Sequence, residues 1–497
     1  MNADAERKLY AQEPVPINLY FAHIQPSFPM FCRNSFMQDF AEKRIPDKLL
    51  NAFFAVSLGL LPPAELSSLF GSSSDNAPQM FAQLAEREGR HQGDSNVGIT
   101  LNDVKAEVLL TLYEYTNFPG RKAWMMAGSL VRAALGMGLN RIDSGVRSPT
   151  LTDFELEERR FVWWSVWKLD SAINCLTASP FGIDSQCIGT ATISTSIADF
   201  EAGVSGKSMQ QFLPPDSTRS WTLAQQLLAT DTEDGMNMYL FAVCHLRTVS
   251  MCRQRLHANP TLDLVSQLMA LRNTLSCVRL SLPPWYLESA RQSDLETQEK
   301  HRLRLETILI LYMTQVQAFL PFANGRIDDL IKDDDLANWQ ECVVLCEHIA
   351  SIIHHWRPEY FTIADPMISA LIWFAWCILT IHTMSTFGQS GPTSDVKIAN
   401  ALDLLILALE VFAQHWRISR LLLDSTKNLQ VWAWLKMDFF DVLSVLAQLR
   451  IPIDPLKPEP CFVDLWEIVG QRDQMGLASG GVVPAVSAID MSSWPLI

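Results

Sequence analysis

The sequence of 497 residues contains no closely spaced cysteine pair of the kind that binds zinc. Its ten cysteines stand at positions 32, 175, 187, 244, 252, 277, 342, 346, 377 and 461, and none follows another after only two residues. Tetrahedral zinc sites on short turns depend on such Cys-x-x-Cys spacing. Because the cysteines are scattered over apolar stretches, they are typical of a reducing compartment, where they pack as small hydrophobic residues.

Catalytic motifs are missing as well. Neither Gly-x-Ser-x-Gly nor His-Glu-x-x-His occurs in the chain. The Gly-Lys-Ser triplet at 206–208 resembles the end of a phosphate-binding loop, but the position that needs the first glycine is Glu201, whose carboxylate repels phosphate. Gly136 and Gly138 lie in a predicted helix, where they serve packing. We therefore assign no catalytic residue and expect no enzyme activity.

The nearest approach to a metal-ligand cluster is a group of cysteines and histidines around position 345. On a helix, Cys342 and Cys346 share a face, whereas His348 points elsewhere. His348 and His355 share a face with Glu341, but a single helix rarely supplies enough ligands for a metal ion. We interpret these histidines as structural and assign no metal and no other cofactor.

Positive charge is scarce. The chain has 39 Lys and Arg against 54 Asp and Glu, a net charge of −15 at pH 7. Neutralisation of phosphates supplies most of the affinity of proteins for nucleic acids, so we do not expect this chain to bind DNA on its own. The one dense basic stretch, 300–304 with Arg291 upstream, has acidic neighbours, and we interpret it as a solvent-exposed helix face.

Only one long hydrophobic run is present. Residues 366–394 contain no Asp, Glu, Lys or Arg, and Ile368 to Met384 is nearly continuous apolar sequence. The run carries Ser369 and His382, lacks flanking basic residues and stands alone. We therefore expect a buried core helix and no membrane span. The N-terminus has neither a signal peptide nor a transit sequence.

Strand signals are also rare, and apolar residues recur mostly at helical spacing. We predict an all-α fold, a large irregular helical bundle or array without a fixed-period repeat. The expected organisation is an N-terminal tail (1–13), a first helical half (14–202), a loop or linker (203–219), a second helical half (220–450) and a C-terminal tail (451–497), disordered from about 471. The predicted helices span 15–25, 46–60, 76–89, 101–116, 121–139, 153–177, 221–256, 261–281, 294–320, 335–355, 366–385, 396–416 and 427–449.

Two of these helices have a distinctive sequence. The first begins after Gly120, and its apolar stripe comprises Trp124, Ala127, Gly128, Val131, Ala134, Leu135, Gly138 and Leu139. The second follows a capping box, Thr152 to Glu155, and its stripe is surrounded by Trp163, Trp164 and Trp167. We interpret these tryptophans as core residues. Arg159 and Arg160 form a salt-bridged face with Glu157 and Glu158, and a role between subunits is the alternative.

Three blocks resemble the middle homology region of the fungal-specific transcription factors, a regulatory domain that usually follows a six-cysteine binuclear zinc cluster. They are YFAHIQPSFP at 20–29, GRKAWMMAGSLVRAALGMGLNR at 120–141, and EERRFVWWSVWKLD at 157–170 with SPFGID shortly after. Their order and spacing agree with the family over roughly residues 14–270. One departure is Asn140, where the family often has histidine. The residues that carry the resemblance, which we expect to be structural, are Tyr20, Phe21, Pro26, Pro29, Gly120, Arg121, Trp124, Arg132, Gly138, Arg141, Glu158, Arg159, Arg160, Trp163, Trp164, Asp170 and Asp184.

The resemblance implies transcription control in the nucleus, with the cytoplasm as a second location. It also implies protein partners, such as a zinc-cluster transcription factor or a second copy of the chain, and a small-molecule effector. The family's two Cys-x-x-Cys-x-x-x-x-x-x-Cys halves are absent. Zinc is therefore expected only if a cysteine cluster lies upstream of Met1.

Three arrangements fit this absence: a regulator that binds a partner carrying the zinc cluster, a longer protein whose cluster precedes this sequence, or a relative that competes for partners. The alternative from another class is a cytosolic ligand-sensing or protein-interaction module. Its 15 tryptophans would line a cavity between helices. A deep apolar pocket with converging polar groups would favour that alternative.

Overall fold

The structure, a computed structural model, is helical throughout the residues it describes. Those residues are 15–446 apart from 71–75, 93–97, 145–150, 176–178, 207–210, 214–218, 233, 293–295, 322–331, 387–391, 431–435, 439–440 and 443–444. Within them, extended pairing is limited to two isolated bridges, Ala191 with Phe212 and Ser385 with Met437. The predicted all-α fold is confirmed. The predicted tails, 1–13 and 451–497, lie outside the described residues.

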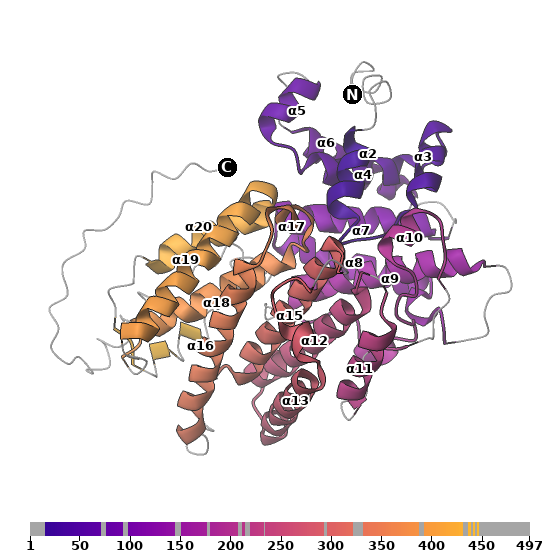
Figure 1. Cartoon of the computed structure of the whole chain (residues 1–497). Helices are drawn as coiled ribbons and strands as arrows, with labels where there is room; N and C mark the ends of the chain where they lie inside the picture. Colours follow the sequence, from indigo (N-terminus) through magenta and orange to yellow (C-terminus); the bar gives the residue numbers. More distant parts are fainter. Residues whose placement is uncertain are drawn as a thin grey trace.

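The first half begins with short helices, and its longer helices are α6 to α9 (Figure 1). In chain order they are α2 (Val15–Leu19), the π-helix η1 (Tyr20–Ile24), α3 (Arg33–Ala41), α4 (Asp47–Leu58), α5 (Pro63–Phe70), α6 (Ala77–Gln92), α7 (Leu101–Asn117), α8 (Arg121–Gly136), the 3₁₀ turn η2 (Leu139–Arg141), α9 (Asp153–Asn174), the 3₁₀ turn η3 (Ser185–Cys187) and α10 (Ile197–Glu201).

The second half contains the longer helices. They are α11 (Ser220–Thr230), α12 (Met236–Ala258), α13 (Leu262–Ser281), α14 (Pro284–Leu287), α15 (Gln298–Phe319), α16 (Lys332–His354), α17 (Pro358–Ile363), α18 (Met367–Met384), α19 (Pro392–His415) and α20 (Arg417–Gln430).

Side-chain caps fix several helix starts. Thr152 caps α9 through a reciprocal box with Glu155, as the sequence predicts. Thr100 caps α7 in the same way through Asp103, a box that the sequence analysis did not predict. The helix predicted from residue 294 begins later, at Gln298, and its N-cap is Thr297, whose hydroxyl accepts from the amide of Lys300 at 3.1 Å. Glu296 pairs with Arg304.

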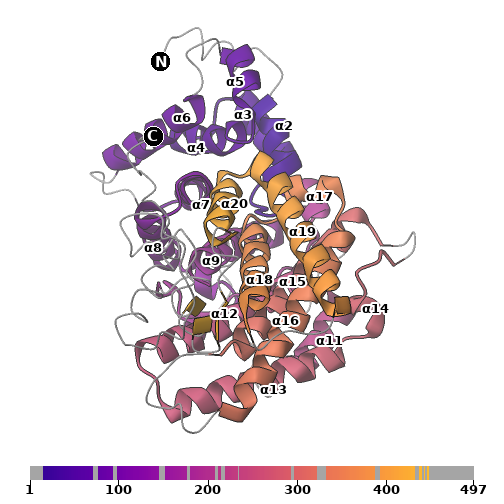
Figure 2. The same ribbon diagram turned by 90° about the vertical axis from the view of Figure 1, so that its left-hand side faces the viewer.

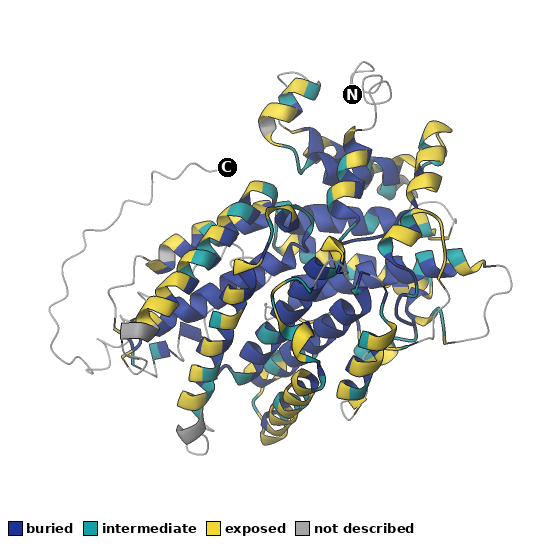
Figure 3. Ribbon diagram, viewed as in Figure 1, coloured by how far each residue is buried: buried dark blue, intermediate teal, exposed yellow. Residues whose placement is uncertain are grey.

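Both halves share one hydrophobic core, which runs from Ile17 to Leu446. Helices α3 to α6 form a cap at one end of the molecule, and α18, α19 and α20 pack side by side along another face (Figures 1 and 2). Figure 3 shows that the central helices α9, α12, α15 and α18 are buried along most of their length. The described residues on either side of 203–219 therefore contribute to one core, and the division of the chain into two halves at that segment stays a prediction.

Helix α18 is the hydrophobic run that raised the question of a membrane span. It is the one helix among the described residues that is long and apolar enough to cross a bilayer, and 94% of it is buried within the protein. A helix that is apolar on all sides is expected in the centre of a large helical domain. The structure thus confirms the predicted buried core helix.

Two predicted helix boundaries are wrong. The predicted helix 221–256 is broken after Thr230 because Asp231 accepts the amide protons of Asn237 and Met238, and Gly235 takes a left-handed conformation (φ 86°) before α12 begins. The predicted helix 427–449 is also wrong. The described part of it includes Met437, whose backbone pairs with Ser385, while the helix α20 occupies 417–430.

The apolar stripe of α8 is turned slightly from its predicted direction. Ala127, Val131 and Ala134 are buried as predicted, but Leu130 is buried and Leu135 is exposed. Gly138 ends the helix in the left-handed region (φ 71°), where glycine is favoured. Leu139, the last predicted member of the stripe, is buried in the 3₁₀ turn η2 beyond that glycine.

Two glycine substitutions test how closely the chain packs at the end of α8 and around Ser144, a few residues further on. A Cβ at Gly189 would lie 2.7 Å from the Cβ of Ser144, whereas a Cβ at Gly136 meets nothing within 4 Å. We expect Gly189→Ala to lower the free energy of unfolding by about 1–3 kcal/mol through overpacking. Gly136→Ala should raise it by about 0.5–1 kcal/mol because alanine favours the helix. Urea unfolding of both variants measures the two effects, and equal effects would contradict the packing described.

Candidate functional site

An irregular segment of chain runs through the middle of the protein. Residues 25–32 have no helical structure, yet all but Pro26 are buried. Backbone polar groups in such a place need hydrogen-bond partners, because burying them without partners costs free energy. The hydroxyl of Tyr20 donates to the carbonyl of Phe28 at 3.1 Å. The side-chain amide of Gln25 donates to the carbonyl of Phe31 and accepts from the backbone amide of Met30. We call residues 20–31, which are the π-helix η1 and the irregular residues after it, the N-terminal strap.

A lysine from α9 holds the strap. The Nζ of Lys168 donates to the carbonyl of Ser27 at 2.6 Å and lies 3.1 Å from the carboxylate of Asp365. It also lies 4.6 Å from the ring centres of Phe28 and Tyr239, a cation–π geometry. The hydroxyl of Tyr239 donates to Asp365 at 2.8 Å. One ammonium group therefore joins the strap, α9, α12 and the start of α18.

Arg302 of α15 holds Pro26, the residue of the strap that precedes Ser27. Arg302 forms an ion pair with Glu306 one turn along the helix and donates to the carbonyl of Pro26 at 3.1 Å. Both side chains of the pair are almost fully buried. The prediction that 300–304 is a solvent-exposed face is therefore wrong. His301, Arg302 and Arg304 are buried, and Arg304 pairs with Glu296 and donates to nearby carbonyls.

We call Lys168, Arg302, Glu306 and Asp365 the central charge cluster. It contains two positive and two negative groups, so the buried charges balance. Burial raises the pKa of Glu306, with a further rise from the nearby charge of Asp365, while Arg302 opposes the shift. Burial, together with Asp365 and Glu306, raises the pKa of Tyr239 well above its usual value, so its hydroxyl remains a donor.

The SPFGID segment is held by a second buried ion pair. The carboxylate of Asp170, near the end of α9, accepts the amide protons of Gly182 at 2.8 Å and Ile183 at 3.1 Å. Arg247 of α12 lies 2.8 Å from the same carboxylate and donates to the carbonyl of Ile183. Asp170 thus fixes the loop after α9 against α12.

Residues in the first half of α9 hold a further irregular stretch of chain, residues 194–195. Arg160 pairs with Asp143 and Glu157, and Glu157 in turn accepts the amide protons of Ser194 at 2.6 Å and Thr195 at 2.9 Å. Of the salt bridges predicted within this motif, the one between Arg160 and Glu157 is present, and both side chains are buried. Glu158 pairs instead with Lys105 of α7.

The remaining motif residues do not converge on a point. Trp163 and Trp164 are buried in the core as expected, and the indole of Trp164 donates to the carbonyl of Ala191 at 2.9 Å. Glu158 pairs with Lys105, whose Nζ lies 4.6 Å from the ring of Phe31 in the strap. Tyr20, Phe21 and Pro29 are buried, and Pro26, Gly120, Trp124 and Arg159 are half-buried, whereas Arg121, Arg132, Gly138, Arg141 and Asp184 are exposed.

The described residues do not form a metal site. No group of three or more His, Cys, Asp or Glu side chains among them is placed to hold a metal ion. Burial raises the pKa of Cys342 to about 12 and that of Cys346 well above its usual value, so both are thiols at neutral pH and poor metal ligands. The zinc that the family implies therefore does not fit these residues.

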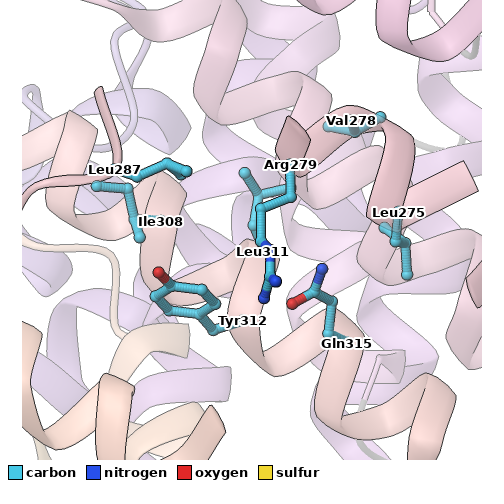
Figure 4. A pocket seen from close by; sticks show the side chains of 8 residues that line it. All are labelled: Leu275, Val278, Arg279, Leu287, Ile308, Leu311, Tyr312 and Gln315. Carbon is cyan, nitrogen blue, oxygen red and sulfur yellow. The ribbon is translucent and has the colours of Figure 1, made fainter. Parts of the chain in front are cut away.

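A small recess lies between α13, α14 and α15 (Figure 4). Tyr312, Arg279 and Gln315 supply its polar groups, and leucine, isoleucine and valine side chains line the rest. Its empty volume is about 270 Å³, part of which is open to solvent. Sites for small molecules usually enclose roughly 300–1,000 Å³, so this recess does not favour the ligand-sensing alternative.

Sequence reasoning missed the central charge cluster. Two signals could have revealed it: Lys168 and Asp170 interrupt an otherwise apolar tryptophan-rich stripe, and Arg302 and Glu306 have the four-residue spacing of a helical ion pair. Asp365 has no such signal, because its partners come from helices far away in the sequence.

Comparison with known proteins agrees with the motifs. A family model described as the fungal specific transcription factor domain matches residues 17–297. The citrinin biosynthesis transcriptional activator mrl3 of Monascus ruber is 29% identical over 130 residues, which are 25% of this chain and 26% of that protein. Protein STB5 of Saccharomyces cerevisiae is 23% identical over 185 residues, 35% of this chain and 24% of that protein.

A transcriptional regulatory protein of Schizosaccharomyces pombe, named as uncharacterized, is 22% identical over 258 residues, 50% of this chain and 28% of that protein. The chain thus spans about a quarter of the length of each of these relatives.

Removing the buried ammonium group tests the central charge cluster. Lys168→Met leaves the Asp365 carboxylate and the Ser27 carbonyl without their cation, and we expect it to lower the free energy of unfolding by about 3–5 kcal/mol. Lys427→Met is the matched control because its ion pair with Asp424 is exposed, and it should cost less than about 1 kcal/mol. Urea unfolding compares the two, and similar losses would show that the cluster does not hold the core.

The buried histidine of α12 predicts a pH dependence of stability. His245 has no hydrogen-bond partner at Nε2, and burial lowers its pKa from 6.5 to about 4. Because the folded-state pKa is depressed, stability is present above pH 6.5 and is lost as the pH falls towards 4. His245→Leu should remove about 2 kcal/mol of the loss between pH 7.5 and 5. The control is the exposed His355→Leu, and equal pH profiles for all three proteins would refute the assignment.

Proposed function

This chain belongs to the fungal specific transcription factor domain family, and from that membership we propose that it regulates transcription in the nucleus. The proposal is supported by the extent of the family match, which covers more than half of the chain, and by relatives whose names describe activators or regulators of transcription. The single observation that carries it is that all three motif blocks contribute to the same core, with Lys168 of the third block donating to the carbonyl of Ser27 in the first.

The protein acts through contacts with other proteins. Its densest basic stretch is folded into the core, and its net charge of −15 disfavours a phosphate backbone. Sequence-specific DNA contacts are therefore supplied by a zinc-cluster module outside the described residues or by a partner that carries one. The motif residues serve as a scaffold in this proposal, and no enzyme chemistry is assigned to them.

Tethering the whole chain to a heterologous DNA-binding domain tests the proposal. We expect a reporter gene with the matching operator to change its expression at least severalfold relative to the DNA-binding domain alone. Abundance is measured by immunoblot so that loss of protein is not mistaken for loss of regulation. A fluorescent fusion of the same chain should accumulate in the nucleus.

Lys168→Met is the matched variant for the tethering assay, since it disturbs the core without touching the surface. It should lose the effect in proportion to folded protein, whereas Lys427→Met should keep it. An abundant, nuclear wild-type fusion that leaves the reporter unchanged would overturn the proposal.

A further inference from the structure

Helix α8 and the turn after it carry motif residues that the core does not use. Arg121, Arg132 and Arg141 belong to the second motif block, and all three are exposed. In the part of the chain that the structure describes, none of them has a carboxylate within ion-pair distance. The buried charges of the third block, in contrast, are paired, as for Arg160 and Asp170. The scaffold role of the motif therefore leaves these three arginines unexplained.

The stretch around these arginines contains no acidic residue. From Tyr115 to Ile142 the sequence has four basic residues and no Asp or Glu, in a chain with 54 acidic residues and a net charge of −15. Of the four, Lys122 is paired with carboxylates of α6 and α7. Arg417 of α20 adds a guanidinium at the start of α8, since it lies 4.9 Å from the ring centre of Phe118. Positive charge is thus concentrated locally on an acidic protein.

One side of α8 presents this charge together with apolar side chains. In a helix with 3.6 residues per turn, Met125 and Leu135 lie on the same side as Arg121 and Arg132. The side chains of Met125 and Leu135 are 59% and 38% exposed. Figure 2 shows α8 at the outer edge of the molecule, and its opposite side packs against α7 and α9. We call six residues the α8 face: Phe118, Arg121, Met125, Arg132, Leu135 and Arg417.

The α8 face is also low in the middle. A Cβ at Gly136, one turn after Arg132, would meet nothing within 4 Å, and a Cβ at Gly128 would meet only the side chain of Arg132 at 3.8 Å. Alanine would be more stable than glycine at either place by about 0.5–1 kcal/mol, so the stability of α8 does not explain these glycines. Small residues at a contact let two helix axes come closer together.

The residue types of the face indicate what it contacts. Arginine and methionine are enriched in protein interfaces, and acidic residues are depleted there. Arginine binds carboxylates through two parallel hydrogen bonds. Arg121 and Arg132 are three helical turns apart, which is about 16 Å along the axis. We propose that the α8 face binds an acidic amphipathic helix of another protein, whose carboxylates lie about 16 Å apart with bulky apolar side chains between them.

The apolar members of the face distinguish this partner from a nucleic acid. A phosphate backbone offers charge but no apolar surface for Phe118, Met125 and Leu135, and the net charge of −15 repels a polyanion. A short peptide carries few charges, and charges farther away than about 8 Å are largely screened at physiological salt. The peptide therefore responds mainly to the arginines that it touches. Charge complementarity and apolar contact together favour it.

This inference names a kind of partner for the proposed function and rests on that function only for its biological meaning. Binding is measured on the purified chain without any reporter gene. A failure to bind therefore leaves the tethering assay untouched, and an unchanged reporter leaves the binding result in place.

Fluorescence anisotropy of a labelled helical peptide, added to the full chain, tests the proposal. The probe has glutamates eleven residues apart, about 16 Å on a helix, with leucine and phenylalanine between them on the same side. We expect a dissociation constant of about 10–100 µM, as for a weak contact, which rises at least about threefold in 0.5 M salt. A peptide with lysine in place of glutamate should not bind. One with serine in place of the apolar residues should bind at least about tenfold more weakly.

Charge reversal locates the binding surface. Arg121→Glu and Arg132→Glu should each raise the dissociation constant at least about tenfold, because each places a carboxylate opposite those of the peptide. Arg255→Glu is the matched control: Arg255 is exposed on α12, outside the face, and its reversal changes the net charge equally. It should change the dissociation constant less than about twofold. Gly136→Ala should weaken binding although it stabilises α8, which separates lost binding from lost folding.

Three outcomes would overturn the proposal. The first is no binding of the acidic peptide by up to about 500 µM of the wild-type chain. The second is equal binding by Arg132→Glu and Arg255→Glu, because the contact would then lie elsewhere. The third is a DNA duplex that binds as tightly as the peptide and displaces it, which would assign the face to nucleic acid.

Discussion

The ammonium group of Lys168 joins four parts of this structure: α9, the N-terminal strap, α12 and the residues before α18. It reaches the carbonyl of Ser27, the carboxylate of Asp365 and the rings of Phe28 and Tyr239, which come from separate parts of the chain. Burying a charge in a protein interior is costly unless partners surround it, so the arrangement of those partners is fixed by the lysine. The same rule applies to Arg302, Arg247 and Arg160, each of which has a carboxylate beside it and a stretch of irregular backbone to hold. Without these charges the carbonyls of Pro26 and Ser27 in the strap, and the amides of Gly182 and Ile183 after α9, would lose hydrogen-bond partners.

The need to pair buried charges also explains where many of the family-motif residues lie. They are spread over surface and core, yet several of their buried acidic and basic members bond backbone amides or carbonyls of irregular segments in the first half. Asp170 holds 182–183, Glu157 holds 194–195, and Glu158 reaches the strap through Lys105. A domain whose buried charges are paired with its own backbone in this way is suited to presenting surfaces to other proteins.

The sequence alone predicts the fold class, most long helices, the burial of α18 and of the α9 tryptophans, and the capping box of α9. These features depend on local periodicity and on contacts within a few residues. The break before α12 could not be predicted from periodicity, because it results from Asp231 and Gly235 acting on the backbone. The burial of 300–304 could not be predicted either, since a run of basic residues is usually exposed and its acceptors, Pro26 and the segment 286–296, are defined only by the tertiary fold.

Amide hydrogen exchange in the N-terminal strap tests the central claim most directly. If buried charges hold this irregular segment in the core, the amides of Phe28 and Met30, which bond the carbonyl of Ile24 and the side chain of Gln25, should exchange only through global unfolding, as slowly as amides in the middle of α9. Exchange of these amides within seconds, at the rate of an exposed loop, would contradict the account and would make the strap a peripheral part of the domain.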